Sequence, residues 1–186
     1  MTIDAIINKA SKGDQQAQYL FFKEYYSYVM AIALRYTKQK CDAEEVVNDT
    51  FLRIFKGLKK YNKKLPIKNW MAKITANASI DFLRKKKNSL HFVEINDHSL
   101  EMVSDQDLVE GLREDTPILP ILQELTPQYR IVFNLYVFEE YKHAEIAEKL
   151  NISIGTSKSN YARAKKVIAE KLKEKKYIDQ LQIHQS

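Results

Sequence analysis

The side chains whose types and spacing most clearly suggest a chemistry lie between residues 154 and 172. One face of this segment presents small or cationic groups, namely Lys158, Ser159, Ala162, Arg163 and Lys166. Lysine and arginine donate hydrogen bonds to guanine edges or pair with phosphates. The pattern predicts a helix that enters the major groove of DNA. An ordinary helical hairpin with a solvated basic face would show the same residues.

The elements that would position this face form a helix-turn-helix. Residues 143–150 predict a short amphipathic helix, and residues 151–153 predict a turn in which Ser153 caps the next helix. Thr126 followed by Pro127 is typical of the start of a preceding helix. Apolar residues at three- and four-residue steps predict the inward face of the second helix. They are Ile154, Tyr161, Ala164, Ile168 and Leu172.

Three longer helices are predicted nearer the N-terminus, over residues 15–37, 42–60 and 69–87. Asp42 and Glu45 have the spacing of a capping box at the start of the second helix. Each helix carries an apolar stripe, and short loops join them, so we expect a compact bundle. The third helix runs into a cationic cluster, Arg84, Lys85, Lys86 and Lys87.

The composition of the 186-residue chain is typical of an all-α folded protein. With four Gly and four Pro, there is little room for the turns of a β-sandwich or barrel. The single cysteine, Cys41, excludes a disulfide framework, and the histidines are not at metal-ligand spacing, so we expect no metal and no cofactor. The N-terminus lacks the pattern of a signal peptide, and no apolar run approaches the length of a membrane span. We therefore expect a cytoplasmic protein.

The net charge of +6 is unevenly distributed along the chain. Residues 1–90 carry 18 Lys and Arg against 8 Asp and Glu, while residues 91–120 carry 1 against 8. The remaining residues carry 11 against 8. This distribution predicts two small helical domains, residues 1–87 and 121–186, joined by an acidic linker over residues 88–120. Two basic blocks suggest that both domains face nucleic acid.

Three blocks of the chain resemble, in order, the sigma-70 family of bacterial transcription-initiation factors. DAEEVVNDTFLRIFKGLKKY (42–61) is similar to the family's DAEDLVQETFLRAW-type core segment. IKNWMAKITANASIDFLRKKK (67–87) is similar to its FRAWLFRIARNLAIDHLRRR segment. Residues 125–172 resemble the C-terminal promoter-reading domain. Two domains with only a short linker are the pattern of the extracytoplasmic-function (ECF) class.

The resemblance implies a protein that has no catalytic residues and docks on core RNA polymerase. In the family, the helix that matches residues 42–58 binds the clamp coiled coil of the polymerase's largest subunit. The matching polymerase-binding positions are Asp42, Glu45, Asn48, Asp49 and Arg53. A capped surface helix with scattered charges would have the same spacing. Reversing the charges of Asp49 and Arg53 is expected to abolish assembly and to leave thermal stability nearly unchanged.

The resemblance also assigns residues 61–87 to the minus-10 promoter element, where the DNA is opened. Strand opening needs a basic surface for the displaced backbone and a pocket for an unstacked base. The matching positions are Lys63, Lys64, Lys68, Asn69, Lys73, Asn77, Arg84, Lys85, Lys86 and Lys87. Trp70 is a candidate stacking platform, although a lone tryptophan at a helix start is more often part of the core, and we favour the core.

For the minus-35 element the matching positions are Thr156, Lys158, Ser159, Arg163 and Lys166. Two departures from the family's usual pattern lie nearby. Ser157 replaces a valine on the inward face, which weakens packing or leaves a hydroxyl to be satisfied. Asn151 replaces the usual turn glycine, and asparagine tolerates the left-handed conformation.

The resemblance implies two further features. The acidic linker of related factors threads the RNA path of the polymerase, although a solvated spacer between two basic domains accounts for the charge equally well. The class commonly has a membrane-bound anti-sigma protein as a partner.

The favoured function is a dissociable initiation factor that directs RNA polymerase to promoter DNA. Two other classes of function are possible alternatives. A stand-alone DNA-binding regulator would use the same helix-turn-helix but leaves residues 42–87 without a role. An enzyme acting on nucleic acid would need a carboxylate cluster, metal-ligand spacing or a phosphate-binding glycine loop, and none of these is found. The initiation factor is therefore the favoured interpretation.

The predicted linker gives a first test of the domain organisation. Limited proteolysis of the free protein should cut between about Asn88 and Thr116 and leave two stable fragments, because this stretch lacks a continuous apolar stripe. Mass spectrometry of the fragments locates the cuts. Protection of the whole stretch would contradict the predicted organisation.

Overall fold

The computed structural model describes the backbone of residues 2–86 and 118–183, with side chains to residue 174. The chain divides into two compact units, Met1–Ser89 and Leu90–Ser186, here called the N-terminal and C-terminal units. All regular elements of the described residues are helical, which confirms the all-α prediction. The expected linker lies largely outside the described residues, as does Lys87.

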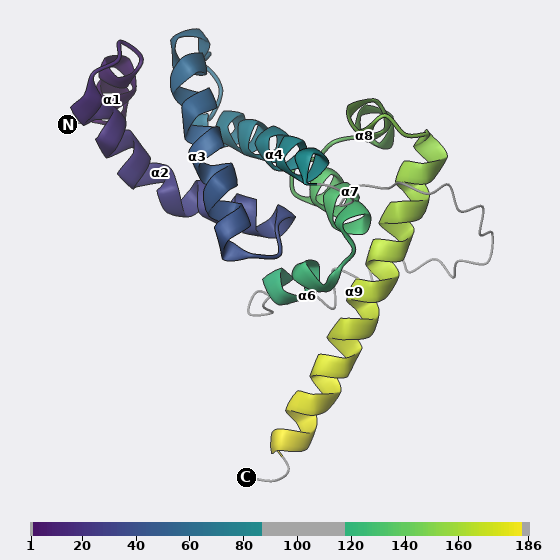
Figure 1. Ribbon diagram of the computed structural model, residues 1–186. Helices are drawn as coiled ribbons and strands as arrows, with labels where there is room; N and C mark the ends of the chain where they lie inside the picture. The colour runs from purple at the N-terminus through teal and green to yellow at the C-terminus, as the bar shows by residue number, and fades with distance from the viewer. Residues whose placement is uncertain (1, 87–117, 184–186) are drawn as a thin grey trace. The chain divides into compact units, whose positions relative to one another are not determined.

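Residues 2–86 of the N-terminal unit form four α-helices and one short 3-10 turn (Figure 1). Helix α2 packs against α1, α3 and α4, and α3 packs against α4 as well. Their bounds are α1 Ile3–Ala10, α2 Gln15–Tyr36, α3 Lys40–Gly57, η1 Leu58–Lys60 and α4 Ile67–Lys85.

Helix α1 was not predicted from the sequence. A helix of eight residues is marginal by itself, and this one is held because Ile7 and Ala10 are buried in the core of the unit. Gly13, with a φ of 90°, makes the turn that follows. The carboxylate of Asp14 then accepts a hydrogen bond of 2.8 Å from the backbone N–H of Ala17 and caps α2.

The core of the N-terminal unit is rich in aromatic rings from α2 and α3. The rings of Phe22 and Phe51 have their centroids 4.6 Å apart, which joins the two helices. Trp70 lies half-buried against this core, with its ring 5.1 Å from that of Tyr61. A Cβ at Gly57 would lie 3.2 Å from the Trp70 ring, so the end of α3 approaches the indole closely. These contacts agree with the core interpretation of Trp70.

Helix α3 begins earlier than the sequence predicted. Its N-cap is Gln39, so Asp42 lies within the first turn and the predicted capping box with Glu45 is wrong. The carboxylate at Asp42 instead lies near the free N–H groups of the helix start, where negative charge is favourable. Helix α4 likewise begins at Ile67, directly after Pro66 and two residues before the predicted start.

The C-terminal unit contains a helix-turn-helix, as predicted (Figure 1). Within its described residues the helices are α6 Ile118–Glu124, α7 Pro127–Val137, α8 His143–Leu150 and α9 Ile154–Ile183. Pro127 is the first residue of α7, as expected. Helix α6 begins within the stretch expected to be linker, and α9 extends beyond the predicted end at Leu172.

The turn between α8 and α9 has the predicted geometry. Asn151 adopts the left-handed conformation, with φ 56° and ψ 52°, and Ser153 Oγ accepts a 3.0 Å hydrogen bond from the N–H of Thr156. Ile154 differs from the prediction, because its side chain is 49% exposed. It lies about 60° around the helix from Ser157, at the edge of the inward face rather than at its centre.

None of the helices in the described residues combines the length and the apolar character needed to cross a bilayer.

Candidate functional site

The predicted docking residues lie on the side of α3 that faces away from the core. Glu45 and Asn48 are exposed, while Asp49 and Arg53 are half-buried. Leu52, which the sequence analysis overlooked, follows Asn48 by one helical turn and is 60% exposed. The available signal was a leucine outside the apolar stripe of an amphipathic helix. A single exposed leucine is common on protein surfaces, and it becomes a candidate contact here because it lies beside the predicted docking residues.

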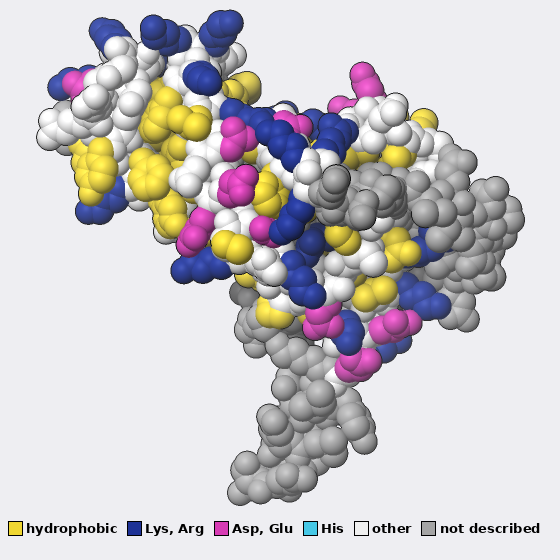
Figure 2. Space-filling model, viewed as in Figure 1, with side chains coloured by type: hydrophobic (Ala, Val, Ile, Leu, Met, Phe, Trp, Pro, Cys, Tyr) yellow, Lys and Arg dark blue, Asp and Glu magenta, His cyan; other side chains and the backbone are white. Residues whose placement is uncertain are grey.

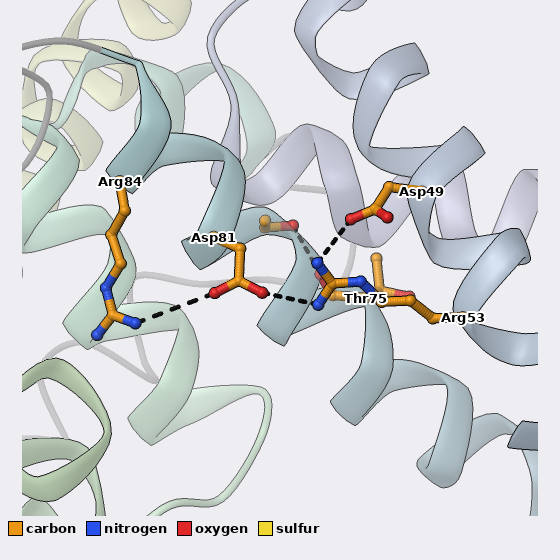
Figure 3. A network of polar contacts seen from close by, with 6 residues as sticks. Asp49, Arg53, Thr75, Asp81 and Arg84 are labelled. Atoms are coloured by element: carbon orange, nitrogen blue, oxygen red, sulfur yellow. Dashed lines mark hydrogen bonds and ion pairs between the residues drawn. The ribbon is translucent and has the colours of Figure 1, made fainter.

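Arg53 bridges two helices instead of pointing freely into solvent (Figure 3). Its Nη2 lies 2.8 Å from Oδ2 of Asp49, one turn earlier on α3. Its Nη1 lies 2.7 Å from Oδ2 of Asp81 on α4. Partial burial lowers the pKa of Arg53, but the hydrogen bonds with Asp81 and Asp49 outweigh this and raise the pKa above its ordinary value. Arg53 is therefore firmly held as a cation between the two helices.

The Arg53 bridge continues toward the C-terminal end of α4. The other carboxylate oxygen of Asp81 lies 4.0 Å from Nη1 of Arg84, a predicted DNA-binding residue. Figure 3 shows Asp81 placed between the two guanidinium groups. One predicted polymerase-binding residue and one predicted DNA-binding residue thus share a single carboxylate.

A second ion pair joins α3 to the C-terminal end of α4. Lys86 Nζ lies 2.8 Å from Oδ1 and 2.6 Å from Oδ2 of Asp42, whose side chain is only 16% exposed. Asp42 was predicted to bind polymerase and Lys86 to bind DNA. The two residues are 44 positions apart in the sequence, and a helical repeat relates only residues a few positions apart. The contact therefore became visible only in the packed helices.

Most predicted minus-10 residues of the described chain are exposed. Asn77 is the exception and is half-buried. Figure 2 shows Lys and Arg side chains gathered at the end of the N-terminal unit, where the loop from α3 to α4 lies. The exposed predicted residues are Lys63, Lys64, Lys68, Asn69, Lys73, Arg84, Lys85 and Lys86.

Internal hydrogen bonds order the loop between α3 and α4. The hydroxyl of Tyr61 donates to the carbonyl of Leu65, and the backbone N–H of Lys64 donates to Oδ1 of Asn62 over 3.0 Å. The hydroxyl of Tyr28 donates to the carbonyl of Lys68 over 3.1 Å and ties the start of α4 to α2. The lysines of the loop remain exposed. The loop therefore presents a cationic surface on an ordered backbone.

On α9 the predicted DNA-binding residues do not all reach the surface. Lys158 is exposed, whereas Ser159, Arg163 and Lys166 are half-buried. The hydroxyl of Ser159 donates to the carbonyl of Thr156 over 3.1 Å. Thr156 is only 6% exposed, and its hydroxyl lies 2.8 Å from the hydroxyl of Ser153. Thr156 therefore belongs to the turn, and we no longer expect its side chain to contact DNA.

Within the described ranges, no group of three or more His, Cys, Asp or Glu side chains is placed to hold a metal ion. The surfaces assembled above suit macromolecular binding, because they combine exposed cations, amides and an exposed leucine.

The Arg53 bridge changes the expected effect of reversing the charges at Asp49 and Arg53. An aspartate at position 53 would lie against Asp81, so the double reversal should destabilise the protein by up to about 1 kcal/mol, the usual range for partly exposed pairs. Urea unfolding of the full chain measures the loss. Glu45→Arg, an exposed change on the same helix, is the control and should cost less. An equal effect of both variants would show that the Arg53–Asp81 pair does not contribute.

Comparisons with known proteins agree on one family. The Sigma-70 region 2 family matches residues 21–89, and the Sigma-70, region 4 family matches residues 117–168. The chain is 30% identical to the RNA polymerase sigma factor SigV of Bacillus subtilis, over 74% of this chain and 80% of that protein. It is 26% identical to the ECF RNA polymerase sigma factor SigW of the same organism, over 94% and 98%.

Among solved structures, the chain is similar to the sigma factor RpoE of Bartonella quintana, crystallised with the anti-sigma factor NepR. The TM-score is 0.49 at 20% identity, over 82% of this chain and 96% of that chain. The ordered pair of family matches and the relative at 30% identity carry the assignment: the chain belongs to the sigma-70 family of RNA polymerase sigma factors, in the ECF class, whose members initiate transcription and are not enzymes.

Proposed function

We propose that three separate surfaces divide the work of this sigma factor. As a member of its family, the protein binds core RNA polymerase and directs it to promoter DNA. In the proposal, the outer face of α3 docks on the clamp of the polymerase's largest subunit. The loop before α4, together with α4 itself, holds and opens the minus-10 element, and α9 reads the minus-35 element as duplex.

The observation that carries the docking assignment is the exposed strip formed by Glu45, Asn48 and Leu52. These residues recur at three- and four-residue steps and therefore share one face of α3. An apolar side chain beside polar groups suits an interface in which the buried centre is more apolar than the rim. Asp42 and Arg53 form ion pairs with α4, so we assign them to arranging charges between α3 and α4 and not to direct docking.

The minus-10 assignment is supported by the exposed cations of the loop and of α4. Lys63, Lys64 and Lys68 can neutralise phosphates of a displaced strand, which contributes affinity without sequence preference. Asn69 and Lys73 lie one turn apart on α4 and offer hydrogen bonds beside that path. Arg84 and Lys85 extend the basic surface to the end of the helix.

The minus-35 assignment is supported by the outer face of α9. Lys158 and Arg163 lie near the N-terminal end of this helix, the part that meets base edges in a helix-turn-helix. Lys166 follows one turn later and suits a phosphate contact. A cytoplasmic location is part of the proposal, because core polymerase and promoter are found there. A membrane-bound anti-sigma protein stays a prediction.

Leu52 gives a sharp test of the docking surface. Leu52→Glu should weaken binding to core polymerase at least tenfold, because it places a charge where an apolar contact is desolvated, and loss of a hot spot typically costs about 2 kcal/mol. Fluorescence anisotropy with labelled factor measures the affinity. Leu65→Glu is the matched control, since Leu65 is similarly exposed but lies outside α3. Equal affinities of both variants would refute the assignment of α3.

The division of labour between the units is tested by run-off transcription with core polymerase. Arg163→Ala should weaken closed-complex formation on duplex promoters, because losing a base-edge contact costs about 1–3 kcal/mol. Asn77→Ala should still bind the duplex but fail to open it, so a promoter with a pre-melted bubble should restore part of its activity.

Permanganate footprinting of both complexes separates binding from opening. Lys173→Ala, an exposed cation farther along α9, is the control and should behave like the wild type. Equal rescue of Arg163→Ala and Asn77→Ala by the bubble, or rescue of neither, would overturn the proposed division.

A further inference from the structure

The hydroxyl of Ser157 has a specific partner inside the C-terminal unit. Ser157 is fully buried in the first turns of α9, where the sequence raised the question of how its hydroxyl is satisfied. Its Oγ lies 2.9 Å from Nδ1 of His143, the first residue of α8. A hydrogen bond therefore crosses the helix-turn-helix directly, at the end of α9 that carries Lys158.

The imidazole of His143 is itself held by two tyrosine rings. It lies nearly parallel to the ring of Tyr136 on α7, with centroids 4.6 Å apart and planes at 17°. Tyr161 on α9 closes the group, 4.4 Å from Tyr136 and 5.7 Å from His143. The three rings come from three different helices, so the position of His143 is defined by stacking on Tyr136 and by a tilted contact with Tyr161.

The hydrogen bond between His143 and Ser157 does not depend on one tautomer. When Nδ1 carries no proton, the serine hydroxyl donates to it, and when Nδ1 carries a proton, its N–H donates to the serine oxygen. The contact thus persists in either state and acts as a geometric restraint.

We propose that His143 and Ser157 are positioning residues for promoter recognition: their hydrogen bond sets the rotation and tilt of α9 so that Lys158 and Arg163 reach base edges. Burial of Ala164 and Ile168 decides which face of α9 is turned inward, but apolar contacts are not directional and define its exact rotation and tilt less closely. A hydrogen bond weakens steeply when its angle is poor. The inference rests on the proposed role of α9 at the minus-35 element.

Phosphate and base contacts should respond differently to loss of this restraint. A bidentate contact to a base edge requires good geometry at both of its hydrogen bonds, whereas a flexible lysine can follow a phosphate through a small shift. Misplacing α9 should therefore lower discrimination between promoters more than it lowers affinity for DNA in general.

The test uses the full chain assembled with core polymerase and two promoter duplexes. One duplex carries a minus-35 element identified by sequencing transcripts made with this factor, and the other has that element scrambled. The ratio of the two dissociation constants, measured at one salt concentration, gives the discrimination. The main variant is the double change His143→Phe with Ser157→Ala, since removing both partners of a buried hydrogen bond is nearly neutral for stability.

The double variant should keep its melting temperature and its affinity for the scrambled duplex, while discrimination falls about tenfold, as when one good base contact is lost. Ser157→Ala alone removes a single oxygen atom, and discrimination should fall for this variant as well. Unchanged discrimination in either variant, or a parallel loss of affinity for both duplexes, would overturn the positioning role.

The variant Arg163→Ala shows whether a negative result contradicts only the positioning role or also the proposed role of α9. If this variant loses discrimination while the His143 and Ser157 variants keep it, the positioning role alone is wrong. If Arg163→Ala also keeps full discrimination, the proposed role of α9 fails, and the positioning inference fails with it.

Discussion

Burial of one face of α3 is the constraint on which the N-terminal unit depends. Val47, Phe51 and Ile54 are almost fully buried, and the ring of Phe51 packs against Phe22 of α2. Truncating side chains of this size in a core typically costs about 2–5 kcal/mol, so the rotation of α3 about its axis is strongly determined. Because that rotation is determined, the opposite face, with Asn48 and Leu52, must be turned outward. The outward position of the surface proposed to dock on polymerase is thus a consequence of core packing.

Ion pairs contribute less free energy to the N-terminal unit than the burial of its apolar side chains does. Partly exposed ion pairs typically contribute no more than about 1 kcal/mol, so Arg53 and Lys86 do not hold the bundle together. They instead fix where the charged side chains of α3 and α4 lie. Arg53 lies between Asp49 and Asp81, and Lys86 lies against Asp42. Surfaces proposed for polymerase and for promoter DNA are therefore connected through salt bridges between α3 and α4.

In the C-terminal unit, polar contacts within the interior add directional restraints to the apolar packing. Ser153 caps α9 by accepting from the N–H of Thr156, and Ser157 meets His143 across the turn. Asn151 takes the left-handed conformation that lets α8 end and α9 begin within three residues. The role proposed for α9 requires a helix that is both stable and accurately oriented, and different residues of the same short segment can serve these two requirements.

Much of this architecture could be predicted from the sequence, because periodicity and turn chemistry are local. The apolar spacing in α2, α3 and α4, the Pro127 start of α7 and the left-handed Asn151 all follow from residues within one or two turns of each other. Helix α1 escaped prediction since eight residues are marginal until Ile7 is buried. The partners of Arg53 and Lys86, which lie 28 and 44 residues away, and the burial of Thr156 were decided by tertiary packing. Periodicity shows which face of a helix is polar, but only the packed helices bring together charges that are distant in sequence.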